Sequence, residues 1–407
     1  MLKRLQEIVA TLRIGGWRSP EALLLLIGAA VPLSFATWMA LLNNFAIERA
    51  DFTGAEIGIL QSLREVPGFL AFTAVFVLLI LKEQRFALLS TILLGIGTAL
   101  TGFFPTVVGL YLTTVLMSIG YHYNETLQQS LALQWVGKDR APIVLGRVIA
   151  MASFSSLIAY GLIWGAFELA GMDYKIVYLI GGGLTVGLAV LAWFAYPQFP
   201  QKVEQHKKLI LRKRYWLYYA LTFNCGARRQ IFIVFAGFMM VEKFGYSVAN
   251  VTLLFLINYA ANIFLAPAIG HLIRRWGERK ALTCEYLGLI FVFTSYAFVT
   301  DANFAAALYV IDHLFFAMAI AIKTYFQKIA DPRDIAPTAA VSFTINHIAA
   351  VVLPVLLGFL WLVNPAAVFL TGTGFAVISL LLTQLMPRMP EPGNETLLSK
   401  PLPQPAE

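Results

Sequence analysis

Charged residues are scarce in this chain of 407 residues, because Asp, Glu, Lys and Arg together make up only 13% of it. A typical globular domain has about 25% charged and about 45–50% apolar residues. Here 59% of the residues are hydrophobic, and the mean hydropathy is +0.74. This balance excludes a soluble enzyme, a disordered protein and a collagen-like or disulfide-rich secreted module. It is typical of a polytopic membrane protein.

Cysteine is also nearly missing, and the common enzyme motifs are not present. The two cysteines, Cys225 and Cys284, lie within apolar runs, so we expect neither a disulfide nor a cysteine-ligated metal site. The sequence contains no HExxH zinc motif and no GxSxG nucleophile elbow. We therefore expect no enzymatic activity, no metal and no cofactor.

In place of charge, the chain has a series of long apolar runs. A bilayer core of about 30 Å is crossed by about 20 residues of helix, so each run predicts one membrane-spanning helix. We expect twelve such spans and an all-α fold. The predicted spans are residues 21–44, 55–81, 86–104, 107–135, 142–168, 174–196, 215–241, 248–273, 281–299, 303–326, 337–362 and 365–386.

Lys and Arg residues gather between the predicted spans and give the chain a net charge of +8. If both termini face the cytoplasm, 23 of the 30 Lys and Arg residues lie on the cytoplasmic side and three on the opposite side. Cytoplasmic loops of membrane proteins are enriched in these residues. We therefore expect a multi-pass protein of the plasma membrane, the inner membrane if it is bacterial, with both termini cytoplasmic. This topology explains the basic charge without a nucleic-acid partner.

A basic linker divides the spans into two halves of six. Similar turns follow the fourth and tenth spans, where Gln134 and Gln327 each precede an Ala-Pro pair, and such a repeat predicts two pseudo-symmetric six-helix bundles. The expected parts are an amphipathic cytoplasmic N-terminus (1–20), an N-terminal bundle (21–196), a cytoplasmic linker (197–214), a C-terminal bundle (215–386) and a disordered cytoplasmic tail (387–407).

The loop between the eighth and ninth spans combines glycines with basic residues. It reads GHLIRRWGERKAL over residues 270–282 and resembles the Gly-xxx-Asp-Arg-x-Gly-Arg-Lys loop of the major facilitator superfamily, although Arg274 stands where that family usually has an acid. With twelve spans and a basic central linker, the chain is similar to these secondary transporters over nearly its whole length. The resemblance implies alternating access and a cytoplasmic gate loop. The gate residues that it implies are Gly270, Arg274, Arg275, Gly277, Arg279 and Lys280.

Ionisable residues inside spans are candidate functional residues, because a central Arg, Lys or Asp costs about 2.5–3.5 kcal/mol to insert. In the fourth span, His122, Glu125 and Gln129 share one helical stripe. A histidine and a carboxylate one turn apart can exchange a proton, so we predict that His122 and Glu125 couple transport to protons. A structural hydrogen-bond cluster is the alternative. Asp312 and His313 of the tenth span are a second candidate pair.

The second span carries the adjacent residues Arg64 and Glu65. Neighbouring helical residues point about 100° apart, so we expect the two side chains to pair poorly with each other. Glu125 is then the favoured partner of Arg64, and contact with the substrate is the alternative.

Basic residues of the C-terminal half predict an anionic substrate. Arg228 and Arg229 lie midway along the seventh span, which has no carboxylate at that depth. Guanidinium groups suit carboxylates and phosphates. The alternative is that at least one of them pairs with Asp312 or Glu65. The substrate-binding residues that we predict are Arg64, Gln129, Arg228, Arg229, Lys323, Asn346 and His347.

These features predict a secondary active transporter, a symporter or antiporter of a small organic anion such as a carboxylate, a phosphate or a metal chelate. Two alternatives stay open: a multidrug-type exporter of lipophilic compounds, and a non-transporting membrane assembly factor on the same fold. The expected partners are the small-molecule substrate, the lipid bilayer and protons, and we expect a monomer.

Overall fold

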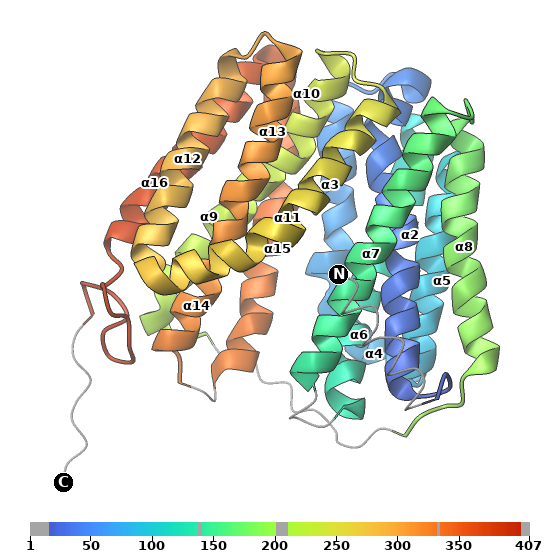
Figure 1. Cartoon of the computed structure of the whole chain (residues 1–407), viewed down its shortest axis with the longest axis horizontal. Coiled ribbons are helices and arrows are strands. Elements are labelled where there is room, and N and C mark those ends of the chain that lie inside the picture. The colour runs from blue at the N-terminus through green and yellow to red at the C-terminus, as the bar shows by residue number, and fades with distance from the viewer. Residues whose placement is uncertain (1–15, 137–140, 201–210, 332–333, 400–407) are drawn as a thin grey trace. The chain divides into compact units, whose positions relative to one another are not determined.

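The computed structural model describes residues 16–136, 141–200, 211–331 and 334–399 of the chain. This part is helical apart from turns and one isolated β-bridge between Glu391 and Asn394, so the all-α prediction is confirmed. The helices follow the twelve predicted spans in order (Figure 1). Most of the N-terminal segment predicted to be amphipathic lies outside the described residues.

Nine of the predicted spans are single continuous α-helices in the described part of the chain. They are α2 (Pro20–Ala50), α5 (Glu83–Thr101), α6 (Val107–Trp135), α7 (Ala141–Glu168), α8 (Tyr174–Ala195), α11 (Val248–Trp276), α12 (Glu278–Phe298), α15 (Ile335–Val363) and α16 (Pro365–Gln384).

The second, seventh and tenth spans are interrupted. In the second span Pro67 lies two residues before the end of the first helix, where its missing N–H weakens the helical ladder. By length and composition, eight helices among the described residues are apolar enough to cross a membrane. The segments of the broken spans are α3 (Gly54–Phe69), η1 (Ala71–Thr73) and α4 (Ala74–Val77), then α9 (Trp216–Ile231), η3 (Phe232–Ala236) and α10 (Gly237–Glu242), and finally α13 (Ala302–Phe316), η4 (Ala317–Ala319) and α14 (Ile320–Ile329).

Local sequence sets several helix ends. The Ser19 hydroxyl accepts a hydrogen bond from the Ala22 backbone N–H at 3.2 Å, and Pro20 occupies the first helical position of α2. Asn364 and Pro365 repeat this arrangement at the start of α16. A polar cap satisfies a backbone donor that would otherwise lack a partner, and proline has no N–H to lose at that position.

Contacts divide the chain into two units, which are described separately. Unit 1 comprises Met1–Phe52, Leu63–Gln205 and Tyr246–Leu256, and unit 2 comprises Thr53–Ser62, His206–Gly245 and Ile257–Glu407. The units therefore differ from the two predicted bundles by two exchanged segments, the start of α3 and the start of α11.

In unit 1, α5 packs against α6 and α8, and α2 packs against α7 and α8 (Figure 1). Its apolar core includes the buried side chains of Leu23, Leu24, Leu127, Leu131 and Val148. Between helices in a membrane, close packing of this kind supplies most of the attraction.

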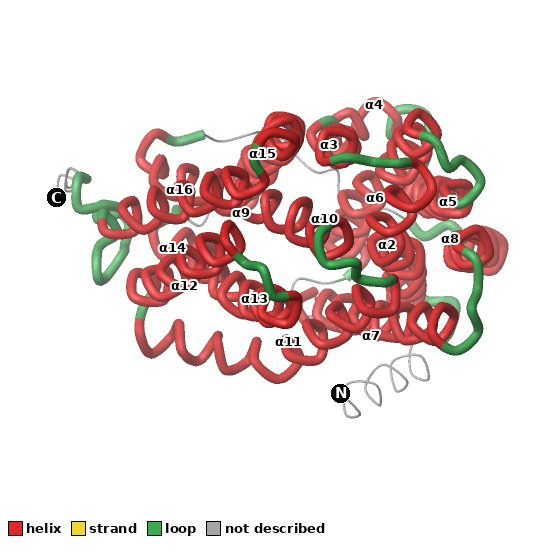
Figure 2. Tube along the Cα trace, turned by 90° about the horizontal axis from the view of Figure 1, so that it is seen from above, coloured by secondary structure: helices red, strands yellow, loops and turns green. Residues whose placement is uncertain are grey.

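In unit 2, α12 packs along α16, and α9 packs against α15 and α16 (Figure 2). At Gly226 the backbone of α9 comes so close to α15 that an added Cβ would lie 2.7 Å from the Asn346 Oδ1 atom. A larger residue at this position would have to displace the Asn346 side chain, so glycine favours the close packing of α9 against α15.

A polar network ties the end of the linker to the start of α15. The Arg212 guanidinium and the Tyr215 hydroxyl both donate hydrogen bonds to the Asp334 carboxylate, each at 2.8 Å. The side chain of Asp334 is buried. Its position after the tenth span places this network outside the membrane-spanning segments.

The tail packs against the same end of unit 2. The Tyr325 hydroxyl donates to the Glu395 carbonyl at 2.5 Å, Arg214 lies 3.7 Å from the Glu395 carboxylate, and the Leu397 N–H donates to the Leu385 carbonyl. The prediction of a disordered tail is therefore wrong for residues 387–399. Polar composition suggested disorder, but a buried glutamate with two partners anchors the segment. Residues 400–407 lie outside the described part.

We expect Asp334→Asn to lower the thermal midpoint of the purified protein at pH 7. The Arg212 guanidinium holds the pKa of Asp334 below its usual value, so ionised Asp334 stabilises the folded state above its unfolded pKa of about 3.9. That contribution disappears as the pH falls through the lowered pKa. The difference between wild type and variant, measured by intrinsic fluorescence, should therefore begin to narrow below about pH 4. A difference that is equal at pH 7 and pH 3.5 would contradict this assignment, and Glu391→Gln on the exposed tail is the control.

Candidate functional site

Buried charges of unit 2 gather where α9, α12 and α13 meet. Arg228 of α9 is 1% exposed, Glu285 of α12 is 0% exposed and Asp312 of α13 is 5% exposed. The Arg228 Nη2 atom lies 3.6 Å from the Glu285 Oε1 atom. In a buried environment an unpaired charge is strongly disfavoured, so each of these groups needs the others.

The Arg228 side chain is fixed by its own helix and by a ring. Its Nε–H donates to the Asn224 carbonyl at 3.3 Å, and its guanidinium carbon lies 4.4 Å from the centre of the Tyr286 ring. Both terminal nitrogens are buried without a hydrogen-bond partner among the described residues, apart from the Glu285 ion pair. Arg228 is therefore rigidly held and retains donor capacity.

Glu285 is the site residue that the sequence analysis missed. It is a lone acid inside the predicted ninth span, and the rule applied to the other spans, that ionisable residues at membrane depth mark function, would have selected it. The alternative considered for the arginines, pairing with an acid of another span, holds for Arg228. The acid is Glu285 rather than Asp312 or Glu65.

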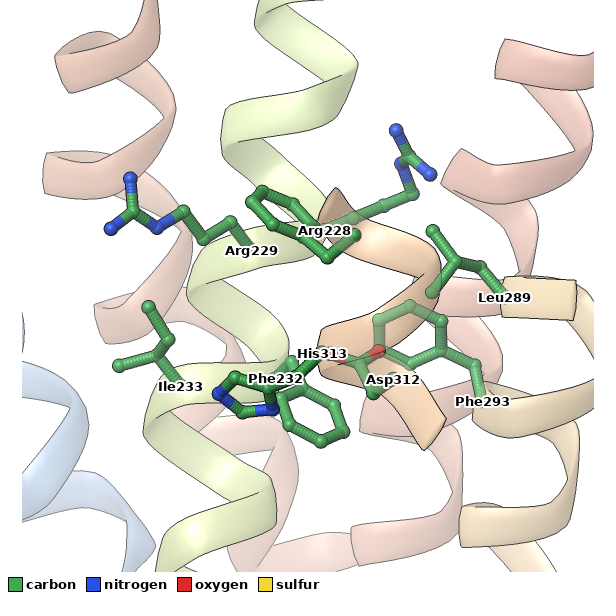
Figure 3. A pocket seen from close by; sticks show the side chains of 9 residues that line it. Arg228, Arg229, Phe232, Ile233, Leu289, Phe293, Asp312 and His313 are labelled. Atoms are coloured by element: carbon green, nitrogen blue, oxygen red, sulfur yellow. The ribbon is translucent and has the colours of Figure 1, made fainter. Parts of the chain in front are cut away.

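A cavity of about 150 Å³ lies beside this cluster (Figure 3). Most of its wall is aromatic or aliphatic, and the charged groups come from α9 and α13. The lining residues are Arg228, Arg229, Phe232, Ile233, Leu289, Phe293, Asp312, His313 and Phe316. Predicted residues from two different spans, the arginine pair and the Asp312–His313 pair, are thus brought together.

The two adjacent arginines have different roles. In Figure 3 their side chains extend in opposite directions from α9. Arg228 is buried against Glu285, whereas Arg229 is exposed and its guanidinium carbon lies 5.9 Å from the centre of the Phe316 ring. No carboxylate of the described residues forms an ion pair with Arg229. Arg229 is therefore the guanidinium of this cavity that an external anion can reach.

Lys323 does not belong to this cavity. It is exposed on α14, and it is not among the lining residues. The 3₁₀ turn η4 separates α14 from α13. The predicted grouping of Lys323 with Arg228 is therefore not formed here.

His313 lines the cavity, and one of its ring nitrogens is held by its own helix. Its Nδ1 lies 2.9 Å from the Tyr309 carbonyl oxygen, and because a carbonyl can only accept, Nδ1 carries the hydrogen. The Nε2 atom is then an acceptor in the neutral ring and can take up a proton.

A π-helical turn shapes the same wall. Regular α-helix ends at Ile231, and residues Phe232–Ala236 form a π turn before α10 begins. The wider turn shifts the helical register directly after the arginines, so that Phe232 and Ile233 line the cavity together with Arg229. Such turns are frequent at functional sites.

In unit 1, the expectation that Arg64 and Glu65 pair poorly with each other is wrong. Arg64 pairs with its neighbour Glu65, with 3.0 Å between Arg64 Nε and Glu65 Oε1, and its guanidinium lies 5.7 Å from the centre of the Trp38 ring. The Ser118 hydroxyl also donates to the Arg64 carbonyl. Long flexible stems bridge the 100° between neighbouring positions, and burial leaves little solvent to compete.

The predicted pair in the fourth span does form. The His122 Nδ1 atom lies 4.0 Å from the Glu125 Oε2 atom, with the histidine buried and the glutamate side chain 50% exposed. This arrangement is compatible with proton exchange. The side chain of Gln129 lies outside the described part.

The other predicted residues fall into two groups. On α15, Asn346 packs against Gly226, and the His347 Nδ1 lies 2.8 Å from the Phe343 carbonyl. In the gate loop, Gly277 has φ +79°, which favours glycine, and Arg279 donates to Gln384 at 3.1 Å. The residues of this loop that remain exposed are Gly270, Arg274, Arg275 and Lys280.

Comparison with known proteins gives a consistent result. The sequence matches the Major Facilitator Superfamily over residues 22–354 and 220–405. The structure is similar to that of the nucleoside transporter NupG, with a TM-score of 0.70 and 16% identity over 90% of this chain and 98% of that chain. It is also similar to a bacterial homolog of the human lysosomal transporter Spinster in an inward-facing, unoccupied conformation, with a TM-score of 0.71 and 14% identity over 89% and 95%. No curated protein matches the sequence. At these identities the structural likeness concerns the fold alone.

Proposed function

Because the chain belongs to the Major Facilitator Superfamily, whose members are secondary transporters, we propose that it carries a small organic anion across the membrane by alternating access. The observation that carries the proposal is Arg229, an exposed guanidinium in a largely apolar cavity with no carboxylate partner among the described residues. A cationic or purely lipophilic substrate would leave this charge uncompensated, which disfavours a multidrug-type exporter. Neither the fold nor the cavity calls for enzymatic chemistry.

Charge balance supports coupling to protons. Arg228 and Arg229 carry two positive charges, and Glu285 and Asp312 carry two negative charges when ionised, so the cluster is neutral. A bound monoanion adds one negative charge, which is costly in a site of low polarity. Uptake of one proton by Asp312 or by His313 restores neutrality. The cluster is therefore suited to symport of one anion with one proton.

The Lys and Arg distribution supports the orientation of the protein. With 23 of 30 such residues on one side, the linker, the tail and the N-terminus are assigned to the cytoplasm and the protein to the plasma membrane. The His122–Glu125 pair of unit 1 remains a second candidate for proton uptake.

Transport by purified protein in lipid vesicles tests the function. We expect an acidic exterior to drive accumulation of at least one labelled anion from a panel of monocarboxylates, dicarboxylates and organophosphates, and a protonophore to abolish it. Protein-free vesicles correct for passive entry of weak acids. Accumulation of cationic or neutral compounds only, or of no compound, would contradict the proposal.

A further inference from the structure

The cavity of unit 2 is small and mostly apolar, which restricts the substrate. Its apolar wall is formed by Phe232, Ile233, Leu289, Phe293 and Phe316, and its volume is about 150 Å³. An apolar protein cavity of about 150 Å³ accommodates one benzene molecule. The space therefore fits a compact apolar body of about one ring.

The charges at the cavity restrict the substrate further. Arg228 forms an ion pair with Glu285 at 3.6 Å, whereas Arg229, which lines the same cavity, forms none with any described residue. Asp312 lines the same space, and the one proton that it can take up offsets the charge of a monoanion but not a second negative charge on the ligand. A dianion, a phosphate ester or an anionic metal chelate would thus bring more negative charge than this cavity can offset.

We infer that the substrate is a monocarboxylate whose apolar body is about the size of a single aromatic ring. The carboxylate binds the Arg229 guanidinium, which offers a planar fork of donors, and the body lies among the phenylalanine rings. This inference rests on the proposed function and narrows its substrate class. The sequence alone was compatible with carboxylates, phosphates and metal chelates.

Phe316 sets the size limit. It lines the cavity from the end of α13, its side chain is only half-buried, and its ring lies below the Arg229 guanidinium at 5.9 Å. It therefore touches both the charged and the apolar part of the space. Phe293 is fully buried against Phe232, so its removal would disturb the fold as well as the cavity.

Calorimetric titration of the purified protein with chosen probes tests the inference. Benzoate and cyclohexanecarboxylate should bind, and benzamide should bind at least about tenfold more weakly because it has the same shape without the charge. Acetate lacks the apolar body, and phosphate and citrate carry surplus charge, so all three should bind at least about tenfold more weakly than benzoate.

A variant with an enlarged cavity tests the size limit without knowledge of the natural substrate. In Phe316→Ala the preference for benzoate over 2-naphthoate should fall by at least about tenfold, since a few carbon atoms in an apolar pocket change affinity by about that much or more. Phe304→Ala on the same helix is the matched control, because Phe304 is 46% exposed and does not line the cavity. Its preference should equal that of wild type.

The outcomes separate the two proposals. If vesicles accumulate an anion but the protein binds citrate, phosphate or acetate more tightly than benzoate, the substrate class is wrong and anion transport stands. An unchanged preference in Phe316→Ala likewise overturns the assignment of this cavity. If no anion accumulates, the proposed function itself fails.

Discussion

Replacing Arg229 by glutamine should reduce anion transport by about 10- to 100-fold while the protein stays folded. Hydrogen bonds to charged groups contribute about 1.5–3 kcal/mol, and about 1.4 kcal/mol corresponds to a factor of ten. Arg229 is exposed and has no ion pair among the described residues, so its loss breaks no buried ion pair. The effect should therefore appear in the apparent affinity and the rate rather than in the thermal midpoint.

The lysine variant separates charge from geometry. Arg229→Lys keeps the positive charge but loses the planar fork, so its transport should lie between those of wild type and Arg229→Gln. Arg388→Gln is the control, because Arg388 is an exposed arginine of the tail with no role in the cavity. Wild-type affinity and rate in Arg229→Gln would remove Arg229 from the transport route.

The helices were largely predictable because a membrane-spanning helix depends mainly on the local composition of the sequence. Runs of apolar residues set the twelve spans, and the predicted start at residue 365 is the first residue of α16. The interruptions were harder to predict. Pro67 signals the break after α3, but no sequence rule marks the π turn at Phe232–Ala236, which depends on packing in unit 2.

The candidate site was half predictable. The cost of inserting charge into a bilayer selected Arg228, Arg229, Asp312 and His313 as candidates, and all four line one cavity. Their partners depend on which helices meet, and a single sequence does not specify this. Glu285 itself was missed although the same rule selects it, since it is an acid inside the predicted ninth span.

The Arg64–Glu65 pair shows a different limit. The angle between neighbouring helical positions describes where side chains start, whereas the ion pair depends on where their ends reach. The side chains of Arg64 and Glu65 are long enough for their charged ends to meet despite that angle. In the tail, likewise, composition indicated disorder, but the buried Glu395 and its partners Arg214 and Tyr325 hold the chain in place.

Removal of Glu285 should cause the largest loss of stability among the substitutions proposed. In Glu285→Ala the buried Arg228 guanidinium loses its ion-pair partner, and breaking a buried pair in this way costs about 3–5 kcal/mol. Asp312, which lines the same cavity as Arg228, compensates part of the charge. Leu287→Ala, at an exposed position on the same helix, is the control and should leave stability within about 0.5 kcal/mol.

Removal of Arg228 should be less damaging than removal of Glu285, although both break the same pair. A guanidinium cannot release its proton in a protein, whereas a carboxylate left alone can become neutral by taking one up. In Arg228→Met the two acids can therefore escape their mutual repulsion by protonation, and the loss should shrink as the pH is lowered. The Arg228 guanidinium that Glu285→Ala leaves behind cannot be neutralised in this way. The loss of stability in Glu285→Ala should therefore stay large at low pH.

The double variant Arg228→Met/Glu285→Ala completes the cycle, because it leaves neither charge of the pair. Replacing a buried ion pair by apolar residues is often neutral or stabilising, so we expect the double variant to be more stable than Glu285→Ala. Unfolding in mixed micelles at pH 7 and pH 5 measures all three variants. If Glu285→Ala is no less stable than Arg228→Met, or if the two losses simply add in the double variant, Arg228 and Glu285 do not depend on each other as the 3.6 Å contact indicates. A large interaction energy, with Arg228→Met rescued at low pH, would instead identify Arg228 and Glu285 as a permanent ion pair. The anion and the proton would then bind beside this pair, at Arg229 and Asp312.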